Sequence, residues 1–398
     1  MSNVHIAGGG IGGLAAALAC ARTGHEVRVS ERASAVSEVG AGVQLGPNVV
    51  KVLYGWGLQE ALAQVAFFPR QLQVRSATTG IHLASLRLGE AFEQRYGAPY
   101  LTIHRADLHG VLLQAVQATS VVDLQFGSAL IGLTQSDDAV SAEFSNNLHT
   151  RSDLLVGADG GWSAVRKLLL DDGTPEPTGH LAYRAMVPQG DLPVHLRSDQ
   201  VTAWLGPKLH VVQYPVRGGD WLNVVAIVHG QVKGDMSHWD HSANAADLRH
   251  SMALACGQLQ ELVGTIAFWR LWPLSIRPPM RGAQEHAKGR VALLGDAAHP
   301  MLPYLAQGAG MAIEDASALA WALGEASGKT QVPDVPAQLQ RYAQARWQRN
   351  AQVQARAIKN GRIFHATGLV RWGRDAALGL LGEKLLNMPW LYGGVAHP

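Results

Sequence analysis

Residues 3–22 read NVHIAGGGIGGLAAALACAR. This stretch begins like a short buried strand and ends like an apolar helix. Between the two, Gly8, Gly10 and Gly13 have the spacing G-x-G-x-x-G. The first glycine permits a tight turn, the second lets the backbone approach a pyrophosphate, and the third lets the helix pack closely on the strand. This pattern predicts a dinucleotide-binding unit.

The unit continues into a second strand within EVRVSER, and this strand ends at Glu31. Glu31 follows the glycines by about twenty positions, where a carboxylate binds a ribose hydroxyl. A carboxylate there disfavours a 2′-phosphate, which leaves NAD and FAD as candidates. Arg32 is expected in the same site. For the glycines alone, a glycine-rich turn that binds nothing remains the alternative.

Composition excludes several classes of protein. The chain has 398 residues, 47% of them hydrophobic and 16% charged, with a formal net charge of +2. These values predict an ordered globular protein of two or so domains, without a basic stripe for nucleic acid or an anionic membrane. Cys20 and Cys256 are the two cysteines, too few for a disulfide framework. With no apolar run long enough to span a membrane and no signal peptide, we expect a soluble cytoplasmic protein, a monomer or homodimer.

Two later segments have the same predicted order of elements: a strand, a glycine-containing loop and a helix. In DLLVGADGGWSAVRKLL the loop holds Asp159 and Gly160, and Ser163 is a candidate helix N-cap. In GRVALLGDAAHPMLPYLAQGAGMAIEDA, residues 289–316, a strand ends before Asp296 and glycines open a helix further on. A helix N-terminus of this kind binds phosphates and other anions. The alternative for the middle segment is an ordinary turn.

The order of these segments predicts an α/β fold with a Rossmann-like, discontinuous nucleotide-binding domain and an inserted β-sheet domain. RQLQVRSATTGIHLASLRL predicts a hairpin, VDLQF to DAVSAEF a meander, and residues 180–275 a separate sheet with one helix near 245–257. The predicted domains are 1–70, 100–178 and 280–334 for the nucleotide, 71–99 and 179–279 for the substrate, and 335–398 as a helical C-terminal region.

The three motifs, in this order and spacing, resemble those of the single-component FAD-dependent aromatic hydroxylases, the p-hydroxybenzoate hydroxylase-like flavoprotein monooxygenases. The resemblance covers nearly the whole chain. It implies FAD as the cofactor, NADH or NADPH as the electron donor, O2 as the oxidant and a small aromatic carboxylate as the substrate. It implies no metal, and His299 shows no partner at metal-ligand spacing in the sequence.

The resemblance also explains why one chain has several nucleotide motifs, because FAD is too long for one loop. The first glycines and Glu31 are expected to hold the pyrophosphate and adenosine ribose, and Asp296 the ribityl chain. The helix that begins at Gly308 would place its positive end beneath the isoalloxazine, where it stabilises the anionic reduced flavin. The full expected set is Gly8, Gly10, Gly13, Glu31, Arg32, Gln44, Arg105, Asp159, Asp296, Gly308, Ala309 and Gly310.

A candidate catalytic pair lies in KLHVVQYPV. If this segment is a strand, His210, Val212 and Tyr214 share one face. A histidine can accept a phenolic proton because its ordinary pKa is near neutral pH. By the resemblance, the matching residues bind or deprotonate a phenol, and Tyr304 lies on the flavin side of the same pocket. The predicted catalytic residues are therefore His210, Tyr214 and Tyr304, against the alternative of a packing histidine and tyrosine.

The segments TGHLAYRAMV, HVVQYPVRGG and PWLYGG resemble the 3-hydroxybenzoate 6-hydroxylases, with the 6-hydroxynicotinate 3-monooxygenases and salicylate 1-hydroxylases as near neighbours. The expected reaction is 6-hydroxylation of 3-hydroxybenzoate to gentisate. Pro303 stands where the first group has glutamine, and Gln44 and Tyr304 stand where the 6-hydroxynicotinate enzymes have histidine. Both other activities therefore remain alternatives, as does a flavin-dependent reductase or a non-catalytic flavin-binding redox protein. Arg184 could bind a carboxylate or form a surface ion pair.

Overall fold

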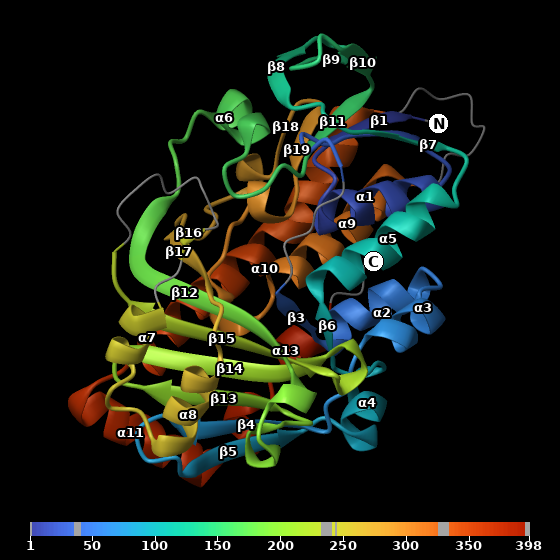
Figure 1. Cartoon of the computed structure of the whole chain (residues 1–398). Helices are drawn as coiled ribbons and strands as arrows, with labels where there is room; N and C mark the ends of the chain where they lie inside the picture. Colours follow the sequence, from blue (N-terminus) through green and yellow to red (C-terminus); the bar gives the residue numbers. More distant parts are fainter. Residues whose placement is uncertain (1, 36–40, 232–240, 243–244, 325–333, 395–398) are drawn as a thin grey trace.

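The computed structural model describes residues 2–35, 41–231, 241–242, 245–324 and 334–394 (Figure 1). It has the predicted α/β architecture, with two large sheets and helices that connect and cover them. Among the described residues, no helix is both long enough and apolar enough to cross a membrane.

The first large sheet has six strands in the order β18-β19-β11-β1-β2-β7. Its strands are β1 (Asn3–Ala7), β2 (Glu26–Ser30), β7 (Val122–Gln125), β11 (Leu154–Gly157), β18 (Ala287–Lys288) and β19 (Val291–Leu293). All neighbouring strands are parallel except β18 and β19. The central strand β11 (LLVG) and its neighbour β19 (VAL) are wholly apolar and buried, as expected for parallel strands covered on both faces, whereas β2 and β7 toward the edge carry charged side chains.

Helices α1 (Ile11–Arg22), α5 (Arg105–Gln117) and α9 (Gly308–Leu323) pack around this sheet, with α10 (Val335–Phe364) against α9 (Figure 1). The predicted apolar helix after the glycines is confirmed as α1. Alanine and glycine line the contact between α1 and α9: a Cβ on Gly12 would lie 3.2 Å from Cβ of Ala312. Small side chains thus bring the two predicted nucleotide helices together.

The second large sheet has eight strands in the order β16-β17-β12-β15-β14-β13-β4-β5. The strands are β4 (Gln71–Ser76), β5 (His82–Arg87), β12 (Glu176–Pro188), β13 (Val201–Gly206), β14 (Leu209–Val216), β15 (Trp221–His229), β16 (His241–Ser242) and β17 (Arg270–Ile276). All pairs are antiparallel except β13 and β4. The predicted hairpin is confirmed as β4 and β5.

Each face of this sheet belongs to a different core. Leu209 and Val211 of β14 pack on one face with α7 (Ala245–Ser251) and α8 (Gly257–Thr265). Tyr214 and Val216 pack on the other face, toward the first sheet and the C-terminal helices. The prediction of a single helix near 245–257 is wrong, because the chain breaks into two helices before Gly257.

The remaining elements connect the two sheets. A two-stranded sheet pairs β3 (Gly42–Leu45) with β6 (Leu101–His104), and a meander contains β8 (Leu130–Gln135), β9 (Val140–Phe144) and β10 (His149–Ser152). The predicted meander is wrong in its first strand, since VDLQF is β7 of the six-stranded sheet. The other helices are α2 (Pro47–Gly55), α3 (Gln59–Val65), α4 (Glu90–Tyr96), α6 (Ala164–Leu170), α11 (Gly368–Leu381), α12 (Glu383–Leu386) and α13 (Pro389–Tyr392).

Candidate active site

The separate sequence motifs meet at one edge of the six-stranded sheet. Strands β1, β2, β11 and β19 run parallel, so the loops that follow them lie at the same, carboxyl edge. These loops hold Gly8, Glu31, Asp159 and Asp296. Parallel pairing therefore gathers residues that are almost three hundred positions apart in sequence.

The first loop is shaped by glycine. Gly8 has φ of +112°, and a Cβ there would overlap the backbone oxygen of Ala158 in the neighbouring loop. A Cβ on Gly13 would overlap the backbone oxygen of Gly8. Gly10, in contrast, has open space where its Cβ would be. The chain is therefore tightly folded around Gly8 and Gly13, and backbone at Gly10 is accessible to a ligand.

Glu31 faces this loop. Its Oε2 accepts a hydrogen bond from the backbone N–H of Gly9 at 2.7 Å, and its Oε1 accepts one from Ala33 at 2.8 Å. A small pocket beside it is lined by Gly9, Glu31 and His109, and Nε2 of His109 lies 2.8 Å from the backbone oxygen of Gly9. His109 carried no sequence signal. Arg32 is exposed next to this pocket.

Asp159 in the middle loop caps a helix. Its Oδ1 accepts a hydrogen bond from Oγ of Ser163 at 2.5 Å, and its Oδ2 accepts one from the backbone N–H of Val165 at 3.1 Å. Ser163 is the N-cap of α6, as predicted, and accepts from the backbone N–H of Arg166 at 2.8 Å. Burial raises the pKa of Asp159. The Asp159 carboxylate thus links its loop to the N-terminus of α6.

The late loop presents a helix N-terminus. Asp296 is exposed, and its side chain has no hydrogen bond to the described residues. Gln307 is the N-cap of α9, but no side chain caps this helix, and its first turn contains no acidic residue. A Cβ on Gly308 would meet open space, whereas one on Gly310 would lie 2.7 Å from Cγ2 of Val49.

These residues fit FAD. Two helix N-termini without side-chain caps, those of α1 and α9, lie together, and glycines with open space, Gly10 and Gly308, stand at both. Uncapped N–H groups and the positive helix end attract a pyrophosphate or an anionic ring. Arg105 begins α5, and one turn later on the same helix Nε2 of His109 lies 2.8 Å from the backbone oxygen of Gly9, so the start of α5 lies beside the first loop.

A buried polar network anchors α9. Oδ2 of Asp315 lies 2.5 Å from Nε2 of His299, and Oδ1 accepts from Nε of Arg346 at 2.7 Å. Although burial opposes it, the charges of His299 and Arg346 hold the pKa of Asp315 well below its ordinary value. His286 and Asp315 do lie near His299, although its sequence surroundings offered no such partner. Arg346 also donates from Nη1 to Oε2 of Glu314 at 2.9 Å, so its guanidinium lies between two carboxylates. The group is therefore a buried ion-pair network.

The substrate-side residues lie on β14. His210 and Tyr214 are both buried, and Val212 and Tyr214 belong to the same hydrophobic cluster as Tyr304. The ring centroids of His210 and Tyr304 are 5.1 Å apart. The predicted alternation is therefore confirmed: His210, Val212 and Tyr214 share the face of β14 that points away from Leu209.

Arg184 lies on this same face. Val212 pairs with Val225 of β15, and Val225 pairs with Arg184 of β12, so the three residues form a row across the sheet. The guanidinium stacks 4.4 Å from the ring centroid of Trp272, and Nε has no hydrogen-bond partner among the described residues. Burial lowers the pKa of Arg184 to about 10, so it remains charged at neutral pH. The suggested surface ion pair is wrong.

Tyr214 is held by close contacts with the connecting sheet. A Cβ on Gly42 would lie 2.5 Å from Cε2 of Tyr214, so only glycine fits there. Oδ1 of Asn223 accepts from the backbone N–H of Gly42 at 2.7 Å. Burial raises the pKa of Tyr214, against the opposing effects of Arg184 and a side-chain hydrogen bond with Gln44. Gln44, expected near the cofactor, thus contacts Tyr214.

Three histidines that the sequence did not single out surround the catalytic candidates. His180 Nδ1 lies 2.5 Å from the hydroxyl of Tyr304, and His365 Nε2 lies 2.7 Å from Nδ1 of His210. His229 contacts His365 in turn. They come from β12, β15 and the end of α10, so no local pattern could have linked them. Burial, with the charge of His180, lowers the pKa of His210 to about 3, so the expectation of a near-neutral pKa is wrong.

Comparisons with known proteins settle the family. The model of a family described as "FAD binding domain" matches residues 1–357. The chain belongs to the FAD-binding flavoprotein monooxygenases. It is 36% identical to "3-hydroxybenzoate 6-hydroxylase" of Polaromonas naphthalenivorans (strain CJ2), over 98% of this chain and 95% of that protein. It is 35% identical to "3-amino-4-hydroxybenzoate 2-monooxygenase" of Streptomyces cremeus, over 99% and 96%.

A solved structure agrees with this assignment. The Klebsiella pneumoniae HpxO structure, complexed with FAD and uric acid, superposes with a TM-score of 0.83 at 25% identity, covering 96% of this chain and 94% of that one. This flavoprotein monooxygenase therefore binds FAD, and it is an FAD-dependent aromatic hydroxylase.

Proposed function

We propose that this monooxygenase hydroxylates a phenolic aromatic carboxylate, and that 3-hydroxybenzoate, converted to gentisate, is the substrate. One observation carries the proposal: His210, Tyr214 and Arg184 lie on the same face of the second sheet. A base, a hydroxyl group and a cation are what recognise a ring with one hydroxyl and one carboxylate.

The spacing of these groups suits such a ring. β12 and β14 are separated by β15, which puts their backbones roughly 10 Å apart. The Arg184 side chain from one strand and His210 from the other can therefore reach opposite substituents of a single benzoate. The same sheet face packs against Tyr304 and the C-terminal helices, which exclude water.

The protein's part in the reaction follows from these positions. FAD held here and reduced by NADH would supply the redox chemistry that transfers one oxygen atom of O2 to the ring. Arg184 binds the carboxylate, and Nε2 of His210 accepts the proton of the phenolic hydroxyl. Tyr214 orients the ring by a hydrogen bond. An ionised hydroxyl raises the electron density at the para carbon, which in 3-hydroxybenzoate is position 6.

The cofactor contacts are part of the same proposal. Gly8, Gly10 and Glu31 hold the pyrophosphate and adenosine ribose. Asp296 would bind the ribityl chain and the N-terminus of α9 would stabilise the isoalloxazine, roles supported by the exposed carboxylate and the uncapped helix. We also propose that residues 1–70, 100–178 and 280–334 form the FAD domain, 71–99 and 179–279 the substrate domain, and 335–398 the helical C-terminal region. NADH is proposed as the preferred electron donor over NADPH.

A substrate panel tests the proposal. The holoenzyme is given 3-hydroxybenzoate, salicylate or 6-hydroxynicotinate, while NADH oxidation and O2 uptake are followed and products are identified by mass spectrometry. We expect 3-hydroxybenzoate to give the largest stimulation, with gentisate as the product. Product formed only from salicylate or 6-hydroxynicotinate would transfer the assignment to that activity. NADH oxidation without any hydroxylated product would favour a reductase or redox protein instead.

A further inference from the structure

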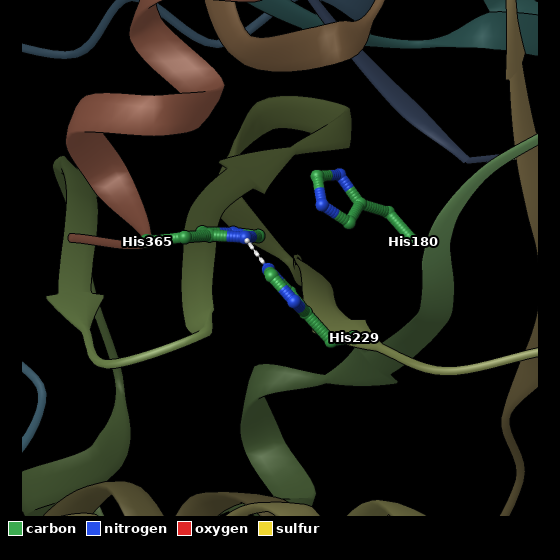
Figure 2. Close-up of side chains that lie close together, drawn as sticks. All are labelled: His180, His229 and His365. Carbon is green, nitrogen blue, oxygen red and sulfur yellow. Dashed lines mark hydrogen bonds between the residues drawn. The ribbon is translucent and has the colours of Figure 1, made fainter. Parts of the chain in front are cut away.

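A chain of hydrogen bonds leads from the candidate base to the surface. Nδ1 of His210 lies 2.7 Å from Nε2 of His365, and Nδ1 of His365 lies 2.9 Å from Nε2 of His229. His210 and His365 are buried, whereas His229 is exposed. Figure 2 shows the second of these bonds, with His180 beside it. The three rings therefore connect a closed pocket to solvent.

The backbone fixes this arrangement. His210 is paired with Ile227 on β15, and His229 ends that strand, opposite His180 of β12. His365 is the C-cap of α10, and its backbone oxygen accepts a hydrogen bond from the N–H of Lys208, just before β14, at 3.1 Å. Sheet register and a helix end thus hold the rings in contact.

We propose that His365 and His229 are a proton relay that carries the proton taken up by His210 to solvent. This inference rests on the proposed function, in which His210 receives the phenolic proton. It assigns roles to two residues that do not touch the substrate and that act through His210.

The relay balances proton by proton. Nε2 of His210 takes the proton of the substrate hydroxyl, while the Nδ1–H of His210 passes its proton to Nε2 of His365. The Nδ1–H of His365 passes its proton to Nε2 of His229, and Nδ1 of His229 releases one to water. Each ring gains one proton and loses one, so it ends neutral in its other tautomer. The substrate is left as the phenolate.

Such a relay removes a difficulty with an isolated base. Burial lowers the pKa of His210 to about 3, and burial together with His210 lowers that of His365 to about 2. A phenol has a pKa of about 10, so a stable phenolate–imidazolium pair would be disfavoured by a factor of roughly 10⁷. Concerted transfer through neutral rings avoids a lasting charge on either buried histidine.

The charged and titratable groups around the chain favour neutral rings. His180 faces both His210 and His365, and its own pKa is lowered to about 4, by burial and then by His229. Lys208 faces His229, and Arg374 faces His365. The positive charges of Lys208 and Arg374 oppose a positive charge on the relay. Tyr304 contacts His180 and His210, and burial raises its pKa, so it stays protonated.

A bound metal ion is the competing explanation, because His180, His229 and His365 could together offer three nitrogen ligands. Two nitrogens bound to one tetrahedral zinc, each about 2.0–2.1 Å from the ion, are separated by roughly 3.4 Å. The 2.9 Å between His229 and His365 is instead a hydrogen-bond distance. The geometry therefore favours proton transfer over metal binding.

Proton release on substrate binding tests the relay. FAD-loaded enzyme is mixed with 3-hydroxybenzoate in a weakly buffered, anaerobic stopped-flow experiment with a pH indicator. The wild type is expected to release about one proton per site. His365→Gln keeps hydrogen bonds on both sides but cannot exchange tautomers, so release should slow at least tenfold. Added imidazole should restore part of the rate in His365→Ala. The matched control is His195→Gln, an exposed histidine paired with Glu261 outside the chain of rings.

The outcomes separate the relay from the proposed function. If His210→Ala abolishes release but His365→Gln keeps the wild-type rate, the relay is refuted and the base stands. If His210→Ala releases its proton normally, the base itself is refuted. Loss of rapid release after chelator treatment would overturn the relay in favour of a metal. Should His365→Gln fail to bind FAD, the dependence of the wild-type release rate on deuterium content decides. A curved dependence, from several protons in flight, supports the relay, and a linear one overturns it.

Discussion

Replacing Arg184 by methionine tests whether this face recognises a carboxylate. Arg184 is half-buried and remains charged, and its buried Nε–H has no partner among the described residues. A hydrogen bond to a charged group contributes about 1.5–3 kcal/mol. At about 1.4 kcal/mol per factor of ten, its loss should raise the Kd for 3-hydroxybenzoate roughly 10- to 150-fold. Methionine keeps much of the packing on Trp272, so the fold should be retained.

The assay is titration of the FAD-bound protein with 3-hydroxybenzoate and, as the matched ligand, 3-hydroxybenzamide. The amide lacks the negative charge, so its Kd should change far less than that of the acid. Arg184→Lys should lie between the wild type and Arg184→Met, because it keeps the charge but loses the planar fork. If acid and amide lose affinity equally, Arg184 supports the pocket only sterically and the carboxylate assignment is refuted.

Three further predictions follow from single contacts. Gly42→Ala should displace the Tyr214 ring, because its Cε2 would lie 2.5 Å from the new Cβ. Substrate binding should weaken while the FAD content stays unchanged. Normal substrate binding would show that the ring has room to move. His210→Ala should slow hydroxylation by roughly 10²–10⁴-fold. NADH should still be oxidised, but hydrogen peroxide should form in place of hydroxylated product, and hydroxylation should partly recover at higher pH, where the substrate ionises unaided. Full coupling of NADH oxidation to hydroxylation at neutral pH would show that the base is another residue. Burial lowers the pKa of His286 to about 4, below its unfolded value of about 6.5, so the unfolded chain takes up a proton first as the pH falls. The contribution of His286 should leave the unfolding free energy unchanged above pH ~6.5. Between pH ~6.5 and the folded-state pKa of about 4 it should reduce the unfolding free energy by up to about 1.4 kcal/mol per pH unit. Urea unfolding at several pH values should find a weaker slope in His286→Asn.

The sequence predicted the features that depend on local pattern. The glycines at positions 8–13, the strand before them and the helix after them are signals within a few residues of one another. The alternation along the segment that forms β14 likewise predicts that His210 and Tyr214 share one face. Each of these needs only backbone geometry.

Features that depend on sheet register and helix docking could not be read this way. Arg184 shares a face with His210 only because β15 lies between their strands, and His365 reaches His210 only because α10 ends beside β14. The lowered pKa of His210 could not be predicted from the sequence either, because it depends on burial by segments that are distant along the chain. The break between α7 and α8 had too weak a local signal to locate.

Labelled oxygen reveals whether this chain inserts oxygen into a phenolic carboxylate. The enzyme turns over 3-hydroxybenzoate and NADH under oxygen-18 gas, and the product is analysed by mass spectrometry. We predict gentisate that carries one oxygen-18 atom, formed in step with the NADH consumed. Unlabelled product, or NADH consumed with hydrogen peroxide as the sole product, would show that the chain does not hydroxylate this substrate.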